Sequence, residues 1–413
     1  MTGEQQGIDP GVEAGRSGKR VLEMVAPHAI WASTRPAVIF LPLLGLLPAT
    51  EAALPGGEYE RSQFVMRILM LSSGQRVPSS RFRMIPYVRH FRAAGDKCRI
   101  AHSFPEKYDW IPWLGFRPSQ ILKRIVRYGH WWQSRLRGDD IVIIEREIFD
   151  NPTTRFEERF RATTARLVID LDDAVFLRYP DKFERLAAMA DLIVCGNRHL
   201  QDWASARNAN TIVIPTCVEM SRCAAKDWTG IHQRPVRLGW IGTASNVAYL
   251  GVIAGALRRL AATRDFELRI ISSDAQLLES IDLSGVQVRF QTWNRQSDIE
   301  HLPELDIGLM PLAADEEWAK YKCGMKLIQY MAIGIPAVAS SVGVNAEIVT
   351  HGRNGFLAGS DAEWESVLLA LIDNDQLRRS VGAAGRETIR QRYSIEAHFP
   401  RYEAALRELC AVK

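Results

Sequence analysis

The chain has 413 residues, of which 47% are hydrophobic and 24% charged, and its net charge is +4. This composition is that of a soluble globular protein, and the length exceeds what one ordinary core holds, so we expect two domains. The six cysteines include no CxxC pair. That pattern favours a reduced, cytoplasmic protein and argues against a structural zinc site.

Residues 1–65 lack the pattern found in the rest of the chain. Residues 1–20 are polar and Gly-rich and are expected to be disordered. The segment 36–49 is apolar but contains three prolines and is too short to span a bilayer. We expect either that Met66 is the functional start or that 1–65 is a dispensable, poorly ordered extension. The alternative is that 1–65 is a peripheral anchor. A chain that begins at Met66 is expected to fold and remain active.

From Met66 onward, apolar runs bounded by turn residues alternate with helical patterns, as in a buried parallel sheet. An amphipathic helix is expected over 82–94, and Asn151 and Pro152 suit the N-cap and first turn of a helix that ends near residue 163. Strands are predicted at 66–72, 98–102, 140–145, 166–171, 192–195 and 211–214.

A second series follows the stretch 210–237, which contains Pro215, Gly230 and Pro235 and lacks periodicity. Apolar residues at 247, 250, 254, 257 and 261 predict a helix after its first strand. The other elements are strands at 236–241, 266–272, 286–292, 306–311 and 337–341, and helices at 361–372, 375–391 and 395–410. Two such series predict an α/β protein with two Rossmann-like, doubly wound domains, 66–225 and 226–393, facing each other across a cleft.

The stretch 321–354 combines cations with a helix start. Lys322 and Lys326 lie four residues apart, near the start of a helix expected from Met325 to Ile333, so they share one face. Gly324 permits close approach to the backbone, and the first amides of a helix attract anions. The arrangement suits a diphosphate, although a solvated lysine pair beside an ordinary helix start fits the same pattern.

The same stretch resembles the C-terminal signature of the retaining glycosyltransferases of family 4, also described as glycosyl transferases group 1. The run from Gln329 to Ser340, QYMAIGIPAVAS, follows the family pattern E-A-M-A-x-G-x-P-V-V-A-S, and 342–347, VGVNAE, follows its G-G-x-x-E. A weaker similarity extends over about residues 66–410. The chain departs from the family where Tyr321 and Gln329 replace two glutamates.

The resemblance implies the GT-B fold, with an acceptor domain at 66–225, a nucleotide-sugar-binding domain at 226–393 and a final helix, 394–413, that crosses back to the first domain. It also implies that Lys322 and Lys326 act as catalytic residues by neutralising the leaving diphosphate. Donor contacts are expected from Gly242, Thr243, Gly324, Met325, Gln329, Asn345 and Glu347.

On the acceptor side, the resemblance points to the loop after the first strand and to the end of the strand near residue 170. Acceptor contacts are expected from Ser80, Arg81, Arg83, Asp172 and Asp173. Residues 145–147 face the same cleft or form a surface ion pair. The triplet 170–172 is a DxD sequence, which carries a metal in the GT-A fold. GT-B members need no such metal, so no metal or other cofactor is expected.

These features predict a retaining glycosyltransferase that moves a sugar from a UDP- or GDP-sugar to a glycan or lipid-linked acceptor in cell-surface glycan synthesis. The implied mechanism is a front-face attack in which cations and helix amides stabilise the departing diphosphate, whose oxygen assists the attack. The alternatives are a catalytically impaired GT-B-like binding protein, suggested by Tyr321 and Gln329, and a nucleotide-sugar epimerase or phosphorylase on a similar scaffold. No nucleic-acid partner is expected.

Basic residues are concentrated in 67–137, with fifteen Lys or Arg against three acids. Within this segment one apolar helical stripe is flanked by basic residues, Arg124 and Arg127 among them. The stripe consists of Ile121, Ile125, Tyr128, Trp132 and Leu136. Two interpretations remain open. The stripe packs into the core of the first domain, or the segment 104–137 binds an anionic membrane surface reversibly at the cytosolic face.

Overall fold

The computed structural model describes residues 64–230, 234–293 and 301–411, so the expectations for the N-terminal extension lie almost entirely outside the described residues. Two sheets of six strands each form the framework, and both belong to one compact unit that spans residues 48–413. The first sheet ends at Val213 and the second begins at Val236, so the predicted boundary near residue 225 lies between them.

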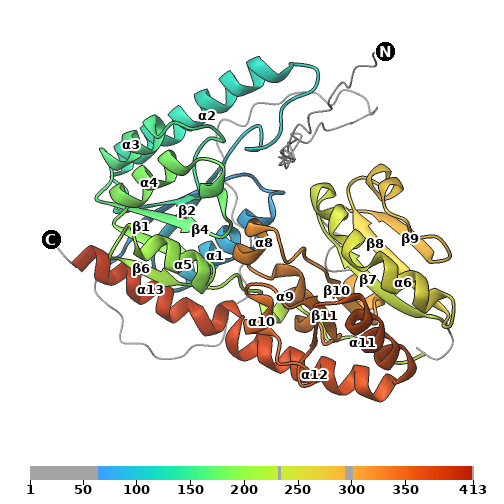
Figure 1. Ribbon diagram of the computed structural model, residues 1–413. Coiled ribbons are helices and arrows are strands. Elements are labelled where there is room, and N and C mark those ends of the chain that lie inside the picture. The colour runs from blue at the N-terminus through green and yellow to red at the C-terminus, as the bar shows by residue number, and fades with distance from the viewer. Residues whose placement is uncertain (1–63, 231–233, 294–300, 412–413) are drawn as a thin grey trace, which may run out of the picture. The chain divides into compact units, whose positions relative to one another are not determined.

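The first sheet is built from the apolar runs of the N-terminal half and has the order β2-β1-β3-β4-β5-β6, with every neighbouring pair parallel. Figure 1 labels β1, β2, β4 and β6 of this sheet. Its strands are β1 (Arg67–Ser72), β2 (Lys97–His102), β3 (Ile141–Glu145), β4 (Arg166–Leu171), β5 (Leu192–Cys195) and β6 (Thr211–Val213). The predicted strand positions of this half are confirmed to within one residue.

Alternate residues of β1 point to opposite faces of the sheet, as the strand period requires. Ile68 and Met70 pack with α1 and α13, whereas Leu69 and Leu71 pack on the side of α3, α4 and α5. The helices are α1 (Ile85–Ala93), which follows a π-helical turn at Ser80–Met84, α2 (Phe116–Arg137), α3 (Arg155–Arg161), α4 (Pro180–Met189), α5 (Arg198–Ser205) and α13 (Ile395–Ala411). Both faces are covered, which explains the nearly continuous apolar strands.

The helix predicted to start at Asn151 and Pro152 is wrong at its N-terminal end. The Asn151 side chain accepts hydrogen bonds from the backbone N–H (3.0 Å) and the hydroxyl (3.1 Å) of Thr153, and α3 starts only at Arg155. An asparagine that closes such a local turn is no longer available as a helix cap.

The second sheet has the order β12-β11-β10-β7-β8-β9, again with every pair parallel. Its strands are β7 (Val236–Ile241), β8 (Phe266–Ser272), β9 (Gln287–Thr292), β10 (Ile307–Met310), β11 (Ala337–Ser340) and β12 (Phe356–Ala358). The sequence pattern predicted all of these strands except β12, which is only three residues long. Two parallel, doubly wound sheets in tandem are the architecture expected from the sequence.

Helices also cover both faces of the second sheet. Trp240 and Leu268 pack on the side of α6 and α11, and Ile241 and Ile271 pack on the side of α9 and α12. The helices are a 3-10 helix η5 (Ala244–Ile253), α6 (Ala254–Ala261), α8 (Glu317–Tyr321), α9 (Met325–Ala332), α10 (Asn345–Ile348), α11 (Asp361–Asp373) and α12 (Asp375–Arg392). The single helix predicted over residues 247–261 is thus two consecutive helices, η5 and α6.

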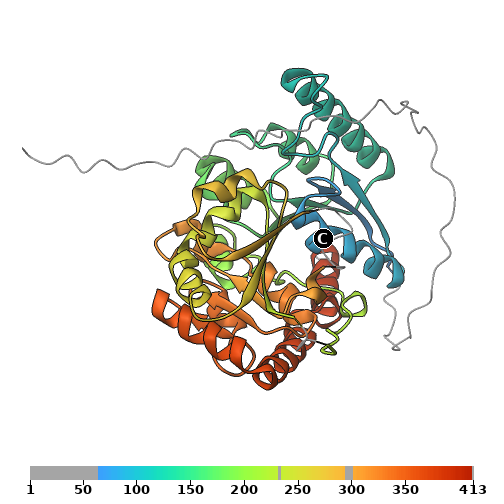
Figure 2. The ribbon, with the colours of Figure 1, turned by 90° about the vertical axis from the view of Figure 1, so that its right-hand side faces the viewer.

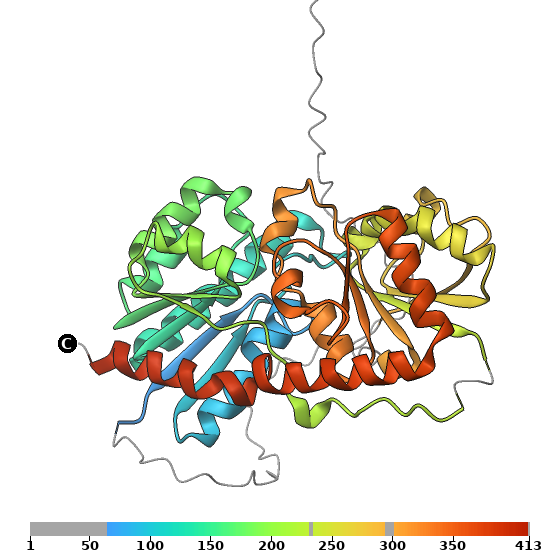
Figure 3. The same cartoon turned by 60° about the horizontal axis from the view of Figure 1, so that its bottom comes forward.

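The chain passes between the sheets twice, and the two crossings are hydrogen-bonded to each other. The Val218 N–H donates to the Tyr393 carbonyl and the Ile395 N–H donates to the Val218 carbonyl, each at 3.0 Å. Beyond this joint, α13 packs on α1, where the Tyr402 ring meets the Tyr87 ring edge-on with centroids 5.2 Å apart. Figure 3 shows α12 and α13 following one another along the two sheets.

Candidate donor and acceptor site

The order of the second sheet identifies the place where a ligand is expected. From β7 the chain continues to β8 and β9 on one side, and β10, β11 and β12 lie on the other. The carboxyl ends of β7 and β10 therefore flank the switch point, where open α/β sheets bind ligands. The loop Gly242–Thr243 follows β7 directly, and the segment after β10 leads to Lys322 and Lys326, which we call the cation pair.

Lys326 lies against the loop that follows β7. Its Nζ is 5.2 Å from the ring centroid of the buried Trp240. A Cβ atom added to Gly242 would stand 2.5 Å from the Trp240 ring and 3.0 Å from Cε of Lys326, so only glycine leaves both side chains in place. Burial lowers the pKa of Lys326 to about 7, and the positive charge of Lys322 adds to this effect. Among the described residues Lys326 has no carboxylate partner.

Lys322 is connected to the same loop through Asn246 of η5. Its Nζ donates to Asn246 Oδ1 at 3.4 Å, and Asn246 Nδ2 donates to Thr243 Oγ1 at 2.7 Å. The ammonium group also lies over the Tyr249 ring, 5.4 Å from its centroid. Asn246 and Tyr249 were not among the predicted site residues. The sequence marks these two residues only by their position: Asn246 lies about one helical turn after Gly242, and Tyr249 about two turns after it.

The start of α9 completes this corner. Gly324, immediately before the helix, has φ +64°, and a Cβ atom there would stand 2.5 Å from Ile348, so glycine is required on both counts. Ile241 N–H donates to the buried Tyr330 hydroxyl at 3.0 Å, which fixes α9 against the end of β7. Met325 and Gln329 are partly buried, and no described residue bonds the Gln329 amide.

Asn345 and Glu347 lie on the short α10 and differ in their surroundings. Asn345 is buried and donates to the Ser340 carbonyl at 3.0 Å, while its Oδ1 has no hydrogen-bond partner in the described chain. Glu347 does not cap its helix. Its Oε1 is 3.5 Å from Nε2 of His199, and it lines a pocket of about 510 Å³ to which neither lysine of the cation pair contributes.

Tyr321 and Cys323, which flank Lys322, contact the first sheet. The Tyr321 ring meets Phe176 edge-on at 5.1 Å, and its carbonyl accepts a hydrogen bond of 2.8 Å from Asn197, the N-cap residue of α5. Cys323 Sγ donates to the Asp172 carbonyl at 3.1 Å. Tyr321 thus packs against residues that follow β4 and β5 of the first sheet.

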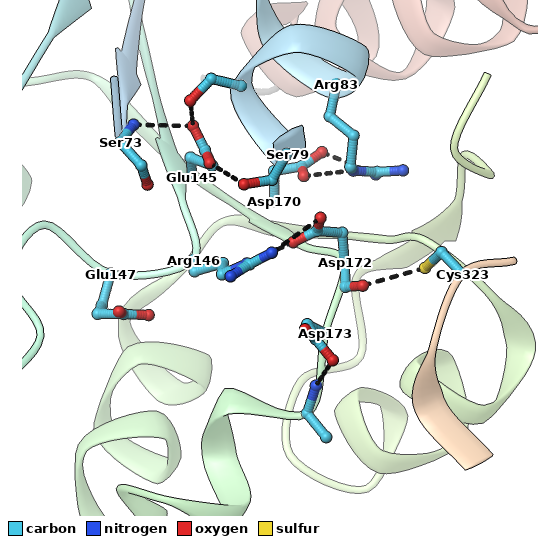
Figure 4. Close-up of polar contacts among 12 residues, drawn as sticks. Ser73, Ser79, Arg83, Glu145, Arg146, Glu147, Asp170, Asp172, Asp173 and Cys323 are labelled. Carbon is cyan, nitrogen blue, oxygen red and sulfur yellow. Dashed lines mark hydrogen bonds and ion pairs between the residues drawn. The ribbon is translucent and has the colours of Figure 1, made fainter. Parts of the chain in front are cut away.

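A layer of buried charges forms at the carboxyl ends of β1, β3 and β4 (Figure 4). Glu145, at the end of β3, accepts hydrogen bonds from the Ser73 backbone (2.8 Å), the Ser79 hydroxyl and the Ser80 hydroxyl (2.5 Å). Ser80 is fully buried in this cluster. Its expected contact with an acceptor is therefore corrected, because its hydroxyl fixes the loop after β1 to Glu145.

Arg83 is likewise buried rather than available to an acceptor. Its Nε and Nη2 donate to the two carboxylate oxygens of Asp170 at 2.6 and 2.8 Å, and Nη1 donates to the Ile214 carbonyl at 2.9 Å. Burial raises the pKa of Asp170 to about 6, although the Arg83 charge acts in the opposite direction. The expectation that Arg83 holds an anionic acceptor is corrected, because its guanidinium is saturated by internal partners.

Asp172 is also paired, with Arg146. Two guanidinium nitrogens of Arg146 donate to its oxygens at 2.5 and 3.1 Å, and the backbone of Arg146 has a positive φ of 59°. Glu147 lies 2.6 Å from Nζ of Lys107, and both side chains are buried. The alternative that residues 145–147 form a surface ion pair is therefore wrong.

Asp173 differs from its neighbours because none of the described arginines bonds it directly. Its Oδ1 accepts a hydrogen bond of 3.0 Å from the Ala174 N–H. Burial raises the pKa of Asp173, against the attraction of Arg146 and of Lys322. Asp173, which follows β4 of the first sheet, is thus electrostatically coupled to Lys322 of the cation pair. Arg81 contributes a further cross-sheet contact, with its guanidinium 5.5 Å from the Trp293 ring centroid.

Within the described ranges, no three His, Cys, Asp or Glu side chains form a cluster suited to a metal.

Residues 235–374 match the family model described as glycosyl transferases group 1. A curated relative, N-acetyl-alpha-D-glucosaminyl L-malate synthase of Bacillus anthracis, is 22% identical over 156 residues, which is 37% of this chain. The match spans 40% of the length of that relative.

Two solved structures share the fold over most of the chain. HepE of Anabaena in complex with UDP and glucose superposes with a TM-score of 0.60 at 16% identity, covering 83% of this chain and 100% of HepE. Sucrose-phosphate synthase from Thermosynechococcus elongatus superposes with a TM-score of 0.66 at 14% identity, covering 84% and 100%.

The fold is therefore the GT-B fold of glycosyltransferases. The segment 235–374, which matches the glycosyl transferases group 1 model, carries the Gly242 loop and the cation pair.

Proposed function

We propose that the protein is a retaining glycosyltransferase of family 4 that transfers a sugar from a UDP- or GDP-sugar. The observation that carries the proposal is the cation pair, Lys322 and Lys326, which lies beside the Gly242 loop and the first turn of α9 without a carboxylate partner among the described residues. Two partly buried positive charges without a directly bonded carboxylate are costly unless an anion joins them. The HepE complex, which contains UDP and glucose, supports the same class of donor.

The proposed chemistry places the diphosphate against the cation pair and the free amides of α9. As the bond to the sugar breaks, negative charge grows on the leaving phosphate, and both lysines stabilise that charge where it develops. The acceptor hydroxyl attacks from the same face and gives its proton to the departing phosphate oxygen. The new sugar–oxygen bond thus forms as the nucleoside diphosphate leaves. Because the lysines supply the positive charge, we propose that no metal is required.

The acceptor is proposed to lie over the carboxyl ends of β3 and β4. Asp173 is the residue of choice there, because it is partly buried, is not held by an arginine and is coupled to Lys322. It is suited to accept a hydrogen bond from an acceptor hydroxyl. Cell-surface glycans and lipid-linked saccharides both supply such a hydroxyl.

The function is tested with the full chain and a panel of nucleotide sugars. Thermal shift should select one nucleotide sugar as the donor. Incubation of that donor with candidate acceptors should release the nucleotide and form a product with retained anomeric configuration. EDTA should not change the rate of this reaction. Isomerisation of the donor without transfer would instead indicate an epimerase. Tight binding without turnover across the acceptor panel would indicate a binding protein.

The low pKa of Lys326 predicts a pH dependence of nucleotide binding. In the free protein the ammonium loses its proton near pH 7, and a bound diphosphate attracts that proton and raises the pKa. Binding of UDP should therefore take up a proton above pH 7, and its affinity should fall as the pH rises further. Calorimetry in buffers of different ionisation enthalpy measures this proton uptake.

The matched control for this experiment is Lys326→Arg, because a guanidinium stays charged throughout the range. The variant should bind UDP with no proton uptake above pH 7. Equal proton uptake in the wild type and the arginine variant would show that another group titrates.

A further inference from the structure

Helix α2 has the inverse of the usual amphipathic arrangement. The side it turns to the first domain carries polar and basic residues, and Lys123 and Arg127 are each only 1% exposed. Lys123 Nζ donates to the carbonyls of Lys107 (2.7 Å) and Asp109 (3.1 Å). Arg127 donates to the carbonyls of Ala101 (3.0 Å) and Ser72 (2.6 Å). The helix is thus held to its domain by cation–carbonyl bonds.

The apolar stripe predicted on this helix faces outward. Ile125 is 61% exposed, Trp132 52% and Leu136 80%, and Ile121 and Tyr128 are exposed beside them. Trp113 and Phe116, just before and at the first turn of α2, are exposed as well. The interpretation that the stripe packs into the core is therefore wrong. Figures 1 and 2 show α2 along the periphery of the first sheet's layer.

This exposure is concentrated rather than scattered. Eight of the thirteen large hydrophobic side chains that are exposed in the described chain lie between Phe104 and Leu136. Exposed apolar residues that occur singly need no explanation, whereas a contiguous group marks a surface that binds a membrane or another molecule.

The charges next to the stripe identify what covers it. Residues 116–137 contain no Asp or Glu, and the exposed Arg117, Arg124 and Arg135 lie on one flank of the stripe at a rotation of about 100° per residue. Arg117 and Arg124 have no carboxylate partner among the described residues. Aromatic rings favour the headgroup level of a bilayer, and an amphipathic helix with arginines beside its apolar face lies in the plane of an anionic surface.

We propose that α2 is a membrane-docking helix that inserts its exposed apolar stripe into the interface of an anionic lipid surface while its arginines contact the headgroups. The helix is about 33 Å long at 1.5 Å per residue, and none of the described helices is long and apolar enough to cross a bilayer. Docking is thus parallel to the surface and reversible. The proposal does not depend on the glycosyltransferase activity, because vesicle binding is measured without a donor or an acceptor.

The test is co-sedimentation of the full chain with phosphatidylcholine vesicles that contain or lack phosphatidylglycerol. The wild type should bind the anionic vesicles, and added salt should release it. Ile125→Ser/Leu136→Ser, which changes two exposed side chains, and Arg117→Glu/Arg124→Glu should each lower the partition coefficient by at least about tenfold. Changing Arg127 is unsuitable as a test because this side chain holds the helix to the fold.

The matched control is Arg185→Glu/Arg353→Glu, which makes the same change in net charge at exposed arginines outside α2. This variant should bind as the wild type does. Circular dichroism and thermal melting of all variants should coincide with the wild type, because every altered side chain is exposed.

Two results would overturn the proposal. Equal recovery in the supernatant with both vesicle types at low salt would show that the stripe does not bind lipid. A wild-type dimer that Ile125→Ser/Leu136→Ser converts to a monomer, together with unchanged vesicle partitioning of that variant, would show that a second copy covers the stripe.

Discussion

Replacing Lys326 with alanine should lower turnover by at least about tenfold, which is the effect of losing one charge-assisted contact of about 1.5–3 kcal/mol. The lysine stands against the Gly242 loop and carries no internal counter-charge in the described chain, so the variant removes stabilisation of the leaving diphosphate without creating an unpaired acid. Steady-state kinetics with the donor selected by thermal shift measure the effect, and the loss should appear in kcat.

The control for this experiment is Lys320→Ala. Lys320 is exposed and its Nζ lies over the Tyr321 ring, 5.7 Å from the centroid, rather than beside the glycine loop. Its replacement should leave turnover within about twofold. If Lys326→Ala also stays within twofold of the wild type, the cation pair is not the diphosphate site.

Replacing Arg83 with methionine should lower the free energy of unfolding by about 3–5 kcal/mol, because breaking a buried ion pair leaves an uncompensated charge. Arg83 and Asp170 are both almost completely buried, and the carboxylate is bonded at both oxygens. Without the arginine, the pKa of Asp170 should rise beyond its present value of about 6. The destabilisation should therefore grow as the pH rises from 5 toward 8, since folding must then either take up a proton on this carboxyl or bury it as an ion.

The exposed pair Arg264–Asp373 provides the matched control. Its two nitrogen–oxygen distances, 2.8 and 3.0 Å, are close to those of the buried pair. Arg264→Met should leave the denaturation midpoint nearly unchanged, because solvent screens the pair. Adding Asp170→Asn to Arg83→Met should restore part of the lost stability and remove its pH dependence. A pH-independent loss in Arg83→Met alone would contradict this account of the buried carboxyl.

The strands were predictable because their signal is local. In β3 and β11 every residue is buried, so the apolar run alone marks the strand. The start of α3 was not predictable from the sequence. Asn151 has two competing uses, as a helix cap or in a side-chain turn, and the choice between them depends on Thr153. β12 was missed since three residues are too few to establish a period of two.

The residues of the candidate site likewise divide into those marked by local sequence features and those whose partners are distant in the sequence. Gly242, Gly324 and Lys326 were proposed from their place at a strand end or a helix start, which are sequence-local features, and the structure places them close to one another. Arg83 was assigned to a ligand because nothing in the sequence shows that Asp170, eighty-seven residues away, occupies it. Asn246 was missed because its bond to Lys322 also spans distant parts of the chain.

Helix α2 shows why a helical stripe does not reveal its own orientation. The spacing of Ile121 and Ile125 gives the same pattern whether the apolar side of the helix faces a core or faces outward. The orientation is decided by Lys123 and Arg127, whose partners are backbone carbonyls. Carbonyls are supplied by every residue type, so no pattern of side chains marks those partners in advance.

The bonded crossings at Val218 and Tyr393 limit how the two sheets can move relative to each other. A single covalent linker would let one sheet swivel about it freely, but two linkers hydrogen-bonded to each other on both sides of Ser394 resist torsion. We expect the remaining freedom to be a bending motion about one axis through that joint. Separating Tyr321 and Cys323 from Phe176 and Asp172 then moves the cation pair away from Asp173 along a single arc. We propose that this angle sets the distance between the proposed donor and acceptor sites, and that the contacts of these four residues oppose its opening.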